Sequence, residues 1–335
     1  MRKVFTVFIC ALSVYTINAQ SLGWKTGFFG FFDNREYFNE YTYDRTLFGS
    51  RLIAEADFAL DERNSFATGL NYLYEFGNDD DWHKPDFTLY YNYNGNINYY
   101  LGLFPRHQLI NQPLVLLSDT IGYFRPNIEG MFIEYRRPFI YHNIWIDWTS
   151  KQGDEKKEIF MIGGSGRLDI GRFFYEHHFS FVHYALPSIV TPNDHIRDNG
   201  GIVSMVGTDL SHRYFFDTLC LSVGLVCSYD RLRHVYDTEI STGFYSELKL
   251  GYKNIGVNGT FYLGNGNILI YGDRFYRSDS YQRLDLYYKL GKSERIYGIV
   301  QFSAHFIPGT IDYSQLLLLR ISLEGKKQLS QYAKD

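Results

Sequence analysis

The sequence predicts an all-β fold, a transmembrane antiparallel up-and-down β-barrel of about 16 strands, within a range of roughly 14 to 18. Three observations predict it. Apolar and polar residues alternate along many segments, aromatic residues make up 19% of the chain, and the connections between segments alternate between long and short. Aromatic residues favour strands and suit a membrane–water boundary. Alternating connection lengths are typical of a barrel inserted from one side of a membrane.

The segment 281–290, YQRLDLYYKL, shows the alternation clearly. Arg283, Asp285 and Lys289 fall on one face, whereas Leu284 and Leu286 fall on the other. A period of two residues indicates a strand with two unlike environments. In a soluble sandwich the leucines would point into a core, and in a barrel they would face lipid while the charged residues line a wet lumen. One strand alone is compatible with either a soluble sandwich or a transmembrane barrel, so the rest of the chain is needed to choose between them.

The same alternation recurs along the whole chain. No stretch has a helical period of useful length, and no Pro/Ser-rich linker divides the chain, so we expect residues 20–335 to form one barrel domain. With boundaries placed to within about two to four residues, strands are predicted at 23–33, 46–60, 65–76, 85–94, 97–105, 127–136, 139–149, 157–168, 172–185, 199–210, 214–230, 238–252, 255–265, 281–291, 294–306 and 312–324.

The connections separate the barrel from a soluble sandwich. The odd-numbered connections are long, as in residues 106–126 and 265–280, whereas the even-numbered ones are short, as in residues 94–96 and 252–254. A sandwich has no reason to alternate in this way. A barrel places every short turn on the periplasmic side and every long loop at the cell surface, so the pattern also predicts orientation.

The N-terminus has the layout of a cleaved signal peptide, residues 1–19. Arg2 and Lys3 precede an apolar run and the small residue Ala19, after which cleavage is expected. The alternative, an uncleaved anchor, requires about 20 apolar residues and the run is shorter. We therefore expect export through the periplasm to the outer membrane. The formal charge of −4 gives no support to nucleic-acid binding.

With its signal peptide, about sixteen amphipathic strands and a long connection after the fifth, the chain resembles a Gram-negative outer-membrane porin over its whole length. Its abundance of Tyr, Phe and Asn looks like porin-like proteins of the Bacteroides group or the phosphate-selective and alginate porins. One departure is that strand 313–324 runs into a charged tail, where porins end on an aromatic residue that the insertion machinery reads. The resemblance implies a channel for passive diffusion of small hydrophilic solutes. It also implies membrane lipid, lipopolysaccharide and the barrel insertion machinery as partners, and a homotrimer as a candidate assembly.

The resemblance further implies that residues 104–127 could fold inward and narrow the pore. Arg106, His107, Asp119 and Arg125 would then line the constriction. Rings of arginine favour anions and acidic rings favour cations. The alternative is an extracellular loop whose apolar residues pack on neighbouring loops.

Charged residues on the polar faces of the predicted strands would line the lumen wall. They create a transverse field, or they pair along the wall and satisfy one another. With the two signs nearly balanced, strong ion selectivity is not predicted. The predicted wall residues are Arg51, Glu55, Asp147, Arg167, Glu176, Arg283, Asp285, Lys289, Arg295 and Arg320.

No enzyme, cofactor or metal site is predicted. His177 and His183 share a strand face but lie too far apart to chelate together, and the GGSG segment at 163–166 lacks the Lys-Ser/Thr and helix of a phosphate loop. A barrel hydrolase would need Ser and His on one outer face. Ser180 and His178 share a face, but it is assigned to the lumen, so a hydrolase is the less favoured alternative.

A closed receptor or adhesion barrel is the other alternative. Its long loops would bind the ligand, and glycan-binding aromatics in residues 187–199 or 265–280 would favour it. Tyr271, Phe275 and Tyr276 are the residues that keep this alternative open.

Overall fold

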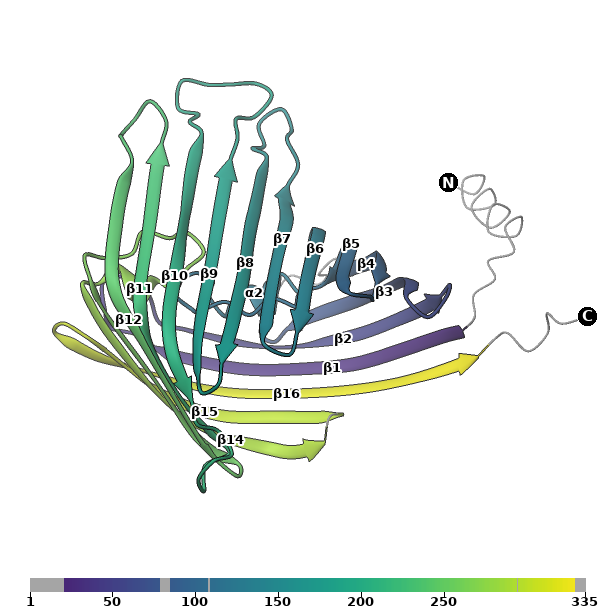
Figure 1. Cartoon of the computed structure of the whole chain (residues 1–335). Helices are drawn as coiled ribbons and strands as arrows, with labels where there is room; N and C mark the ends of the chain where they lie inside the picture. The colour runs from purple at the N-terminus through teal and green to yellow at the C-terminus, as the bar shows by residue number, and fades with distance from the viewer. Residues whose placement is uncertain (1–20, 79–84, 108, 294, 329–335) are drawn as a thin grey trace, which may run out of the picture.

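The computed structural model describes residues 21–78, 85–107, 109–293 and 295–328. The strands form a closed barrel in chain order, and every strand is antiparallel to its neighbours (Figure 1). The strands are β1 (Ser21–Glu36), β2 (Arg45–Ala59), β3 (Asn64–Glu75), β4 (Asp86–Tyr93), β5 (Ile97–Pro105), β6 (Asn127–Arg137), β7 (Ile140–Ser150), β8 (Ile159–Ile170), β9 (Phe173–Tyr184), β10 (Arg197–Asp209), β11 (Thr218–Leu232), β12 (Glu239–Tyr252), β13 (Ile255–Gly264), β14 (Ser280–Ser293), β15 (Ile296–Ile307) and β16 (Thr310–Gln328). Two short helices, α2 (Ile121–Phe124) and η1 (Arg274–Arg277), lie in connections.

The prediction of an all-β, antiparallel, closed barrel is confirmed, and each predicted segment corresponds to one strand. The alternation of connection lengths fails at two places: residues 210–217 between β10 and β11 outnumber residues 233–238 between β11 and β12, and residues 308–309 form a tight last turn with Gly309 at φ 87°. Within the described ranges, no helix has the length and apolar character needed to cross a membrane. The predicted signal peptide, residues 1–19, lies outside the described residues.

The barrel closes where the first strand meets the last. β1 pairs with β16 along its full length, from Ser21 opposite Gln328 to Glu36 opposite Tyr313. Closure satisfies the backbone N–H and C=O groups that an open sheet edge would expose, which is required of a sheet surrounded by lipid. The two ends of the described chain consequently lie side by side.

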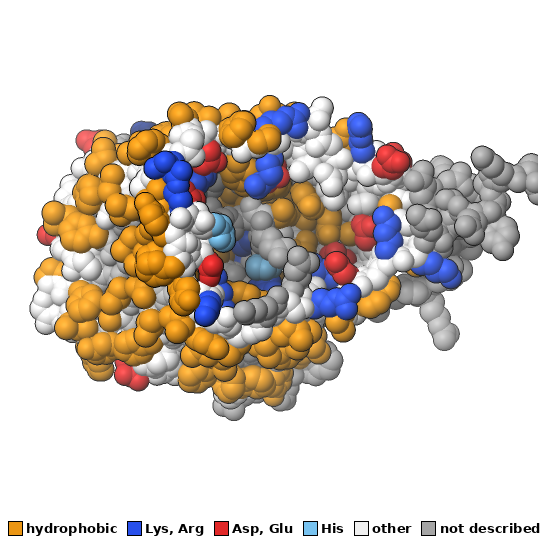
Figure 2. Space-filling model, turned by 60° about the horizontal axis from the view of Figure 1, so that its bottom comes forward, with side chains coloured by type: hydrophobic (Ala, Val, Ile, Leu, Met, Phe, Trp, Pro, Cys, Tyr) orange, Lys and Arg blue, Asp and Glu red, His pale blue; other side chains and the backbone are white. Residues whose placement is uncertain are grey.

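The two faces of the wall have the predicted character. On β14, Arg283 and Asp285 have side chains that are 9% and 12% exposed, whereas Leu284 and Leu286 are 48% and 53% exposed. Figure 2 shows hydrophobic side chains over much of the outer wall, and basic, acidic and histidine side chains around a hollow. An apolar surface this extensive is costly in water. The outer face is therefore suited to lipid.

This facing predicts unequal effects for arginine on the two sides of the wall. Leu286→Arg is expected to lower the free energy of unfolding in lipid vesicles by roughly 2–4 kcal/mol, because it moves a charge into the bilayer. Gln301→Arg is the matched control, since Gln301 lies on the lumen side and donates a hydrogen bond to Ser303 at 3.0 Å. Urea titration of both folded variants measures the difference. Equal losses of unfolding free energy in the two variants would contradict the assignment of Leu286 to the lipid side and Gln301 to the lumen side.

Two long connections occupy the lumen. Val115 and Leu116, from the connection between β5 and β6, are fully buried and pack with Leu269, Phe275 and other interior residues in one cluster. The two segments are joined by backbone hydrogen bonds, from Ser118 N to Tyr271 O at 2.7 Å and from Asp273 N to Leu114 O at 2.8 Å. We call residues 106–126 and 265–279 the lumen segments. Together they form a packed crossing inside the barrel.

Burial of the second lumen segment argues against the alternative that its aromatic residues bind glycans at the surface. Phe275 and Tyr276 are each 1% exposed, and the partly buried Tyr271 packs on a second core cluster. These aromatic side chains stabilise the interior and are not displayed as a glycan-binding surface. Arg295 also differs from its prediction. It lies in the exposed turn between β14 and β15, because β15 begins at Ile296, two residues after the predicted start, so Arg295 is no part of the lumen wall.

Candidate active site

The β8–β9 hairpin brings a serine, a histidine and a carboxylate together on the lumen side. Gly171 and Arg172 form its turn, with Gly171 at φ 66°, a conformation that glycine adopts without strain. The short turn fixes the register, so that Ser165 lies opposite His178 and Arg167 opposite Glu176. Because side chains alternate along a strand, Glu176 and His178 point to the same side.

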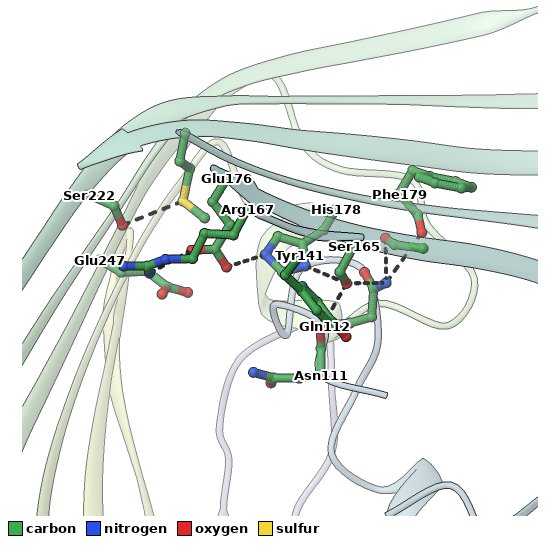
Figure 3. Close-up of polar contacts among 12 residues, drawn as sticks. Asn111, Gln112, Tyr141, Ser165, Arg167, Glu176, His178, Phe179, Ser222 and Glu247 are labelled. Carbon is green, nitrogen blue, oxygen red and sulfur yellow. Dashed lines mark hydrogen bonds and ion pairs between the residues drawn. The ribbon is translucent and has the colours of Figure 1, made fainter. Parts of the chain in front are cut away.

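A chain of hydrogen bonds links the three side chains (Figure 3). Ser165 Oγ lies 2.9 Å from His178 Nδ1, and His178 Nε2 lies 2.6 Å from Glu176 Oε1. Ser165 and His178 are 6% and 5% exposed. An ionised carboxylate only accepts hydrogen bonds, so Glu176 favours the tautomer that carries its proton on Nε2. Nδ1 is then free to accept the serine proton, which is the relation of a nucleophile to its general base.

Arg167 holds the carboxylate of Glu176 in place. Arg167 lies 3.5 Å from Glu176 and also pairs with Asp169 at 2.8 Å and Asp209 at 3.5 Å. Arg167 therefore neutralises part of a local excess of negative charge and leaves one oxygen of Glu176 directed at His178. This arrangement stabilises a positive charge on the imidazole when the serine proton is transferred.

The first lumen segment covers the serine. Gln112 Nε2 lies 2.9 Å from Gly164 O and 3.3 Å from Ser165 Oγ, and Ser165 Oγ lies 3.2 Å from Asn111 O. Gln112 Oε1 is buried and has no hydrogen-bond partner within the described chain. Gln112 thus places an amide donor beside the serine hydroxyl, and the same nitrogen also donates to the backbone oxygen of Gly164.

The four loop residues predicted to line a constriction have different environments. Arg106 is buried and pairs with Asp147 on β7, and Arg125 approaches the same carboxylate at 3.8 Å. Asp119 pairs with Arg35 of β1 at 3.0 Å. Burial raises the pKa of Asp119, but the charges of Arg35 and Arg283 outweigh that effect and hold it below its ordinary value.

Those contacts fasten the segment to the wall, so Arg106 faces Asp147 and not an open pore. His107 is exposed. An effect of these residues on ion selectivity stays a prediction.

Apart from Arg295, the predicted wall residues lie on strands, and several pair with neighbours along or across the wall. Arg283 lies 2.6 Å from Asp285, and Arg51 lies 2.8 Å from Asp86. Glu55 accepts a hydrogen bond from Tyr90 at 3.0 Å. Cation–π contacts place Lys289 over the ring of Tyr287 and Arg320 over the ring of Phe29.

The sequence did not predict the serine that contacts His178. Ser180, which shares a strand face with His178, makes no side-chain hydrogen bond among the described residues. Cross-strand neighbours such as Ser165 and His178 have Cβ atoms about 4.5–5.5 Å apart, closer than same-face residues on one strand. The GGSG segment lies within β8, and the sequence analysis did not single out its serine.

The described residues contain no group of three or more His, Cys, Asp or Glu side chains arranged to hold a metal ion. His177 lies beside His142, with ring centroids 5.4 Å apart and the ring planes tilted by 36°. His183 instead contacts Asp198 at 2.7 Å. The hydrogen-bonded chain of Ser165, His178 and Glu176 is consequently the arrangement with the clearest chemical capability.

Comparisons with known proteins give a family and a fold. A family model described as lipid A 3'-O-deacylase-type matches residues 14–320. No curated protein matches the chain.

Among solved structures, the chain is similar to OmpF of Salmonella typhi in complex with daunomycin, with a TM-score of 0.53, 8% identity and coverage of 92% of this chain and 99% of that one. It is also similar to a loop L8 deletion mutant of OmpT, an outer-membrane protein of Vibrio cholerae, with a TM-score of 0.53, 7% identity and coverage of 91% and 100%. A third is Pseudomonas aeruginosa OpdK with vanillate, with a TM-score of 0.51, 9% identity and coverage of 91% and 99%. At these identities the likeness is one of fold alone.

The family match corrects the expectation that the chain is not an enzyme. That expectation rested on the premise that a barrel hydrolase carries its Ser and His on the outer face. A family defined by deacylation points to enzymatic activity instead, and the candidate residues lie on the inner face. The porin-like fold is compatible with either a diffusion channel or an enzyme.

Proposed function

The chain belongs to the lipid A 3'-O-deacylase-type family, and we propose that it is an outer-membrane serine esterase that removes an ester-linked acyl chain from lipid A. The observation that carries the proposal is the hydrogen-bonded chain from Ser165 through His178 to Glu176. Its geometry is suited to nucleophilic catalysis at an ester, which is the bond that an O-deacylase cleaves.

The proposed reaction has two stages. Ser165 Oγ attacks the ester carbonyl while His178 Nδ1 takes the hydroxyl proton, and the resulting imidazolium is stabilised by Glu176. His178 then returns the proton to the sugar oxygen, which leaves as an alcohol, and the acyl group remains on Ser165. Water, activated by the same histidine, releases the fatty acid and restores the serine. Gln112 supplies a hydrogen bond to the oxyanion.

Entry of the substrate requires movement of the first lumen segment. Asn111 and Gln112 contact Ser165 directly, and the serine is almost fully buried. Displacing Asn111 from Ser165 Oγ would expose the serine to the lumen, while Gln112 stays at the wall beside the reacting carbonyl. Arg106, paired with Asp147, would anchor the segment at one end during that movement.

Passive diffusion of small hydrophilic solutes is the function that the porin-like fold alone would favour. The crossing formed by the two lumen segments argues against it as the main activity, because Val115 and Leu116 are fully buried within the barrel interior. A conductance measurement separates the two functions, since an esterase with this crossing needs no open channel.

The first experiment is an assay of the folded, detergent-solubilised protein with purified hexa-acylated lipid A. The expected result is loss of one ester-linked acyl chain, seen by mass spectrometry as a lighter lipid together with a free fatty acid. The same preparation is placed in a planar bilayer. Unchanged lipid A together with steady conductance steps would sink the esterase proposal and favour a diffusion channel.

A further inference from the structure

A polar cavity lies outside the candidate active site, where β10, β11 and β12 meet their long connections. It has a volume of about 410 Å³ and is lined by residues that include Arg197, Asp230, Tyr236, Glu239, Asn265 and Arg277. These residues come from β10, β11 and β12, from the connection between β11 and β12, and from the second lumen segment between β13 and β14. In Figure 1 the loops after β9 and β11 stand at this end of the barrel. The cavity thus lies at the end of the barrel predicted to face the cell exterior.

One side of the cavity is held rigid by a satisfied carboxylate. Arg197 binds Asp230 through two nitrogen atoms, at 2.9 and 2.8 Å, and Asn199 donates to the same carboxylate at 3.0 Å. The hydroxyl of Tyr236 also donates to Asp230. With four hydrogen bonds, the carboxylate of Asp230 has all its acceptor positions satisfied within the protein. Its role is to fix Arg197 and the ring of Tyr236 as part of the cavity wall.

The opposite side carries polar groups that the protein leaves free. Across the described ranges, neither Glu239 nor Arg277 makes a side-chain hydrogen bond or ion pair, and both are exposed at the cavity. Burial and the nearby charges of Arg274 and Arg197 lower the pKa of Arg277, as expected for a cation without a carboxylate beside it. Asn265 accepts from Ser241 and from the backbone of Thr242 through its oxygen. Its amide N–H groups have no partner among the described residues.

The free groups therefore comprise one strong acceptor, Glu239, and two sets of donors, on Arg277 and Asn265. Opposite charges balance across the cavity, so a simple anion or cation gains little. A hydroxyl group both donates and accepts, so neighbouring hydroxyls on a sugar ring can satisfy all three side chains at once. The volume lies within the usual range for a small-ligand site, roughly 300–1,000 Å³.

We propose that this cavity is a saccharide-binding site, in which Glu239 accepts from, and Arg277 and Asn265 donate to, adjacent sugar hydroxyls. The saccharide could belong to the sugar chain of lipopolysaccharide or be free in solution. The proposal does not rest on the esterase function, because it concerns different residues and is tested by binding.

Isothermal titration calorimetry tests the proposal with the full-length folded barrel. The probes are core oligosaccharide freed of lipid A by mild acid, a neutral disaccharide such as lactose, and inorganic phosphate. Binding of the core oligosaccharide is expected, and Arg277→Gln or Glu239→Gln is expected to weaken it by at least about 10-fold, since each removes a charge-assisted hydrogen bond. Arg274→Gln is the matched control, because Arg274 is an exposed neighbour that does not line the cavity, and it should bind as wild type does.

The outcomes distinguish a lipopolysaccharide sugar from a free saccharide, and a saccharide site from an anion site. Binding of core oligosaccharide alone supports a lipopolysaccharide sugar as the ligand, and binding of lactose as well supports free saccharides. Competition by inorganic phosphate at similar concentration would overturn the proposal in favour of an anion site. Absence of saccharide binding by wild-type protein that migrates as a folded, heat-modifiable band would also overturn it. Loss of lipid A deacylation would leave these results unaffected.

Discussion

The Ser165→Ala protein is expected to release acyl chains from lipid A at least about 10³-fold more slowly than wild type. Alanine has no oxygen to attack the ester, and His178 then has no proton to accept from residue 165. The substitution removes one small side chain that is 6% exposed and lies on the lumen face of β8. We therefore expect the barrel to form normally. Initial rates of fatty-acid release in mixed micelles measure the effect.

Ser180→Ala provides the control for this substitution. Ser180 is 5% exposed, lies on the same strand as His178 and points to the same side, so its loss removes an equivalent hydroxyl from the same wall. Its rate should remain close to that of wild type. A fluorophosphonate probe should label wild type and Ser180→Ala at Ser165, and leave Ser165→Ala unlabelled. If Ser165→Ala stays active while folded, the assignment of the nucleophile is wrong.

The fold was predictable because its determinants are local. A period of two residues marks each strand, and the charged faces of segments such as 281–290 show which side is wet. The boundaries of turns are less well determined by the same signal. Arg295 alternates correctly with Tyr297, so the pattern placed Arg295 in the strand, whereas the structure assigns it to the connection.

The candidate active site was missed because it depends on register between strands. Alternation predicts which residues share a face of one strand, and it brought Ser180 and His178 together. The serine that contacts His178 comes from the neighbouring strand. A two-residue turn at Gly171 and Arg172 would have placed Ser165 opposite His178, so the signal was present in the hairpin itself. It required counting outward from the turn rather than along the strand.

The inward course of the second lumen segment was not predicted either. Its apolar residues, including Leu269 and Phe275, are unusual for a water-exposed loop and were a usable signal. Their burial depends on contacts with Val115 and Leu116, which are about 150 residues away along the chain. A Cβ atom at Gly272 would overlap the carbonyl oxygen of Val115. Such a close approach between two connections leaves no periodic pattern in the sequence.

The second large effect is expected from Glu176→Gln, which should lower kcat for deacylation by roughly 10²- to 10⁴-fold while changing KM little. The carboxylate touches His178 and not the substrate, so Glu176 is a positioning residue. Glutamine is nearly the same size and can still form a hydrogen bond with the ring. It carries no negative charge to stabilise the imidazolium, and its amide can hold His178 in the wrong tautomer. A split between kcat and KM is the signature, because a general structural defect would not spare substrate binding.

Glu247→Gln is the matched control for that measurement. Glu247 also lies on the lumen wall, pairs with Lys249 at 2.8 Å and accepts from Tyr245 at 2.7 Å, whereas the contacts of His178 in the described part of the chain are with Ser165 and Glu176. Its loss should leave kcat close to that of wild type. Glu176→Asp should recover part of the activity, because it restores the charge with a side chain one methylene shorter. Equal losses of kcat in Glu176→Gln and Glu247→Gln would mean that the wall charges act collectively, and the proposed pairing of Glu176 with His178 would then have no special part in catalysis.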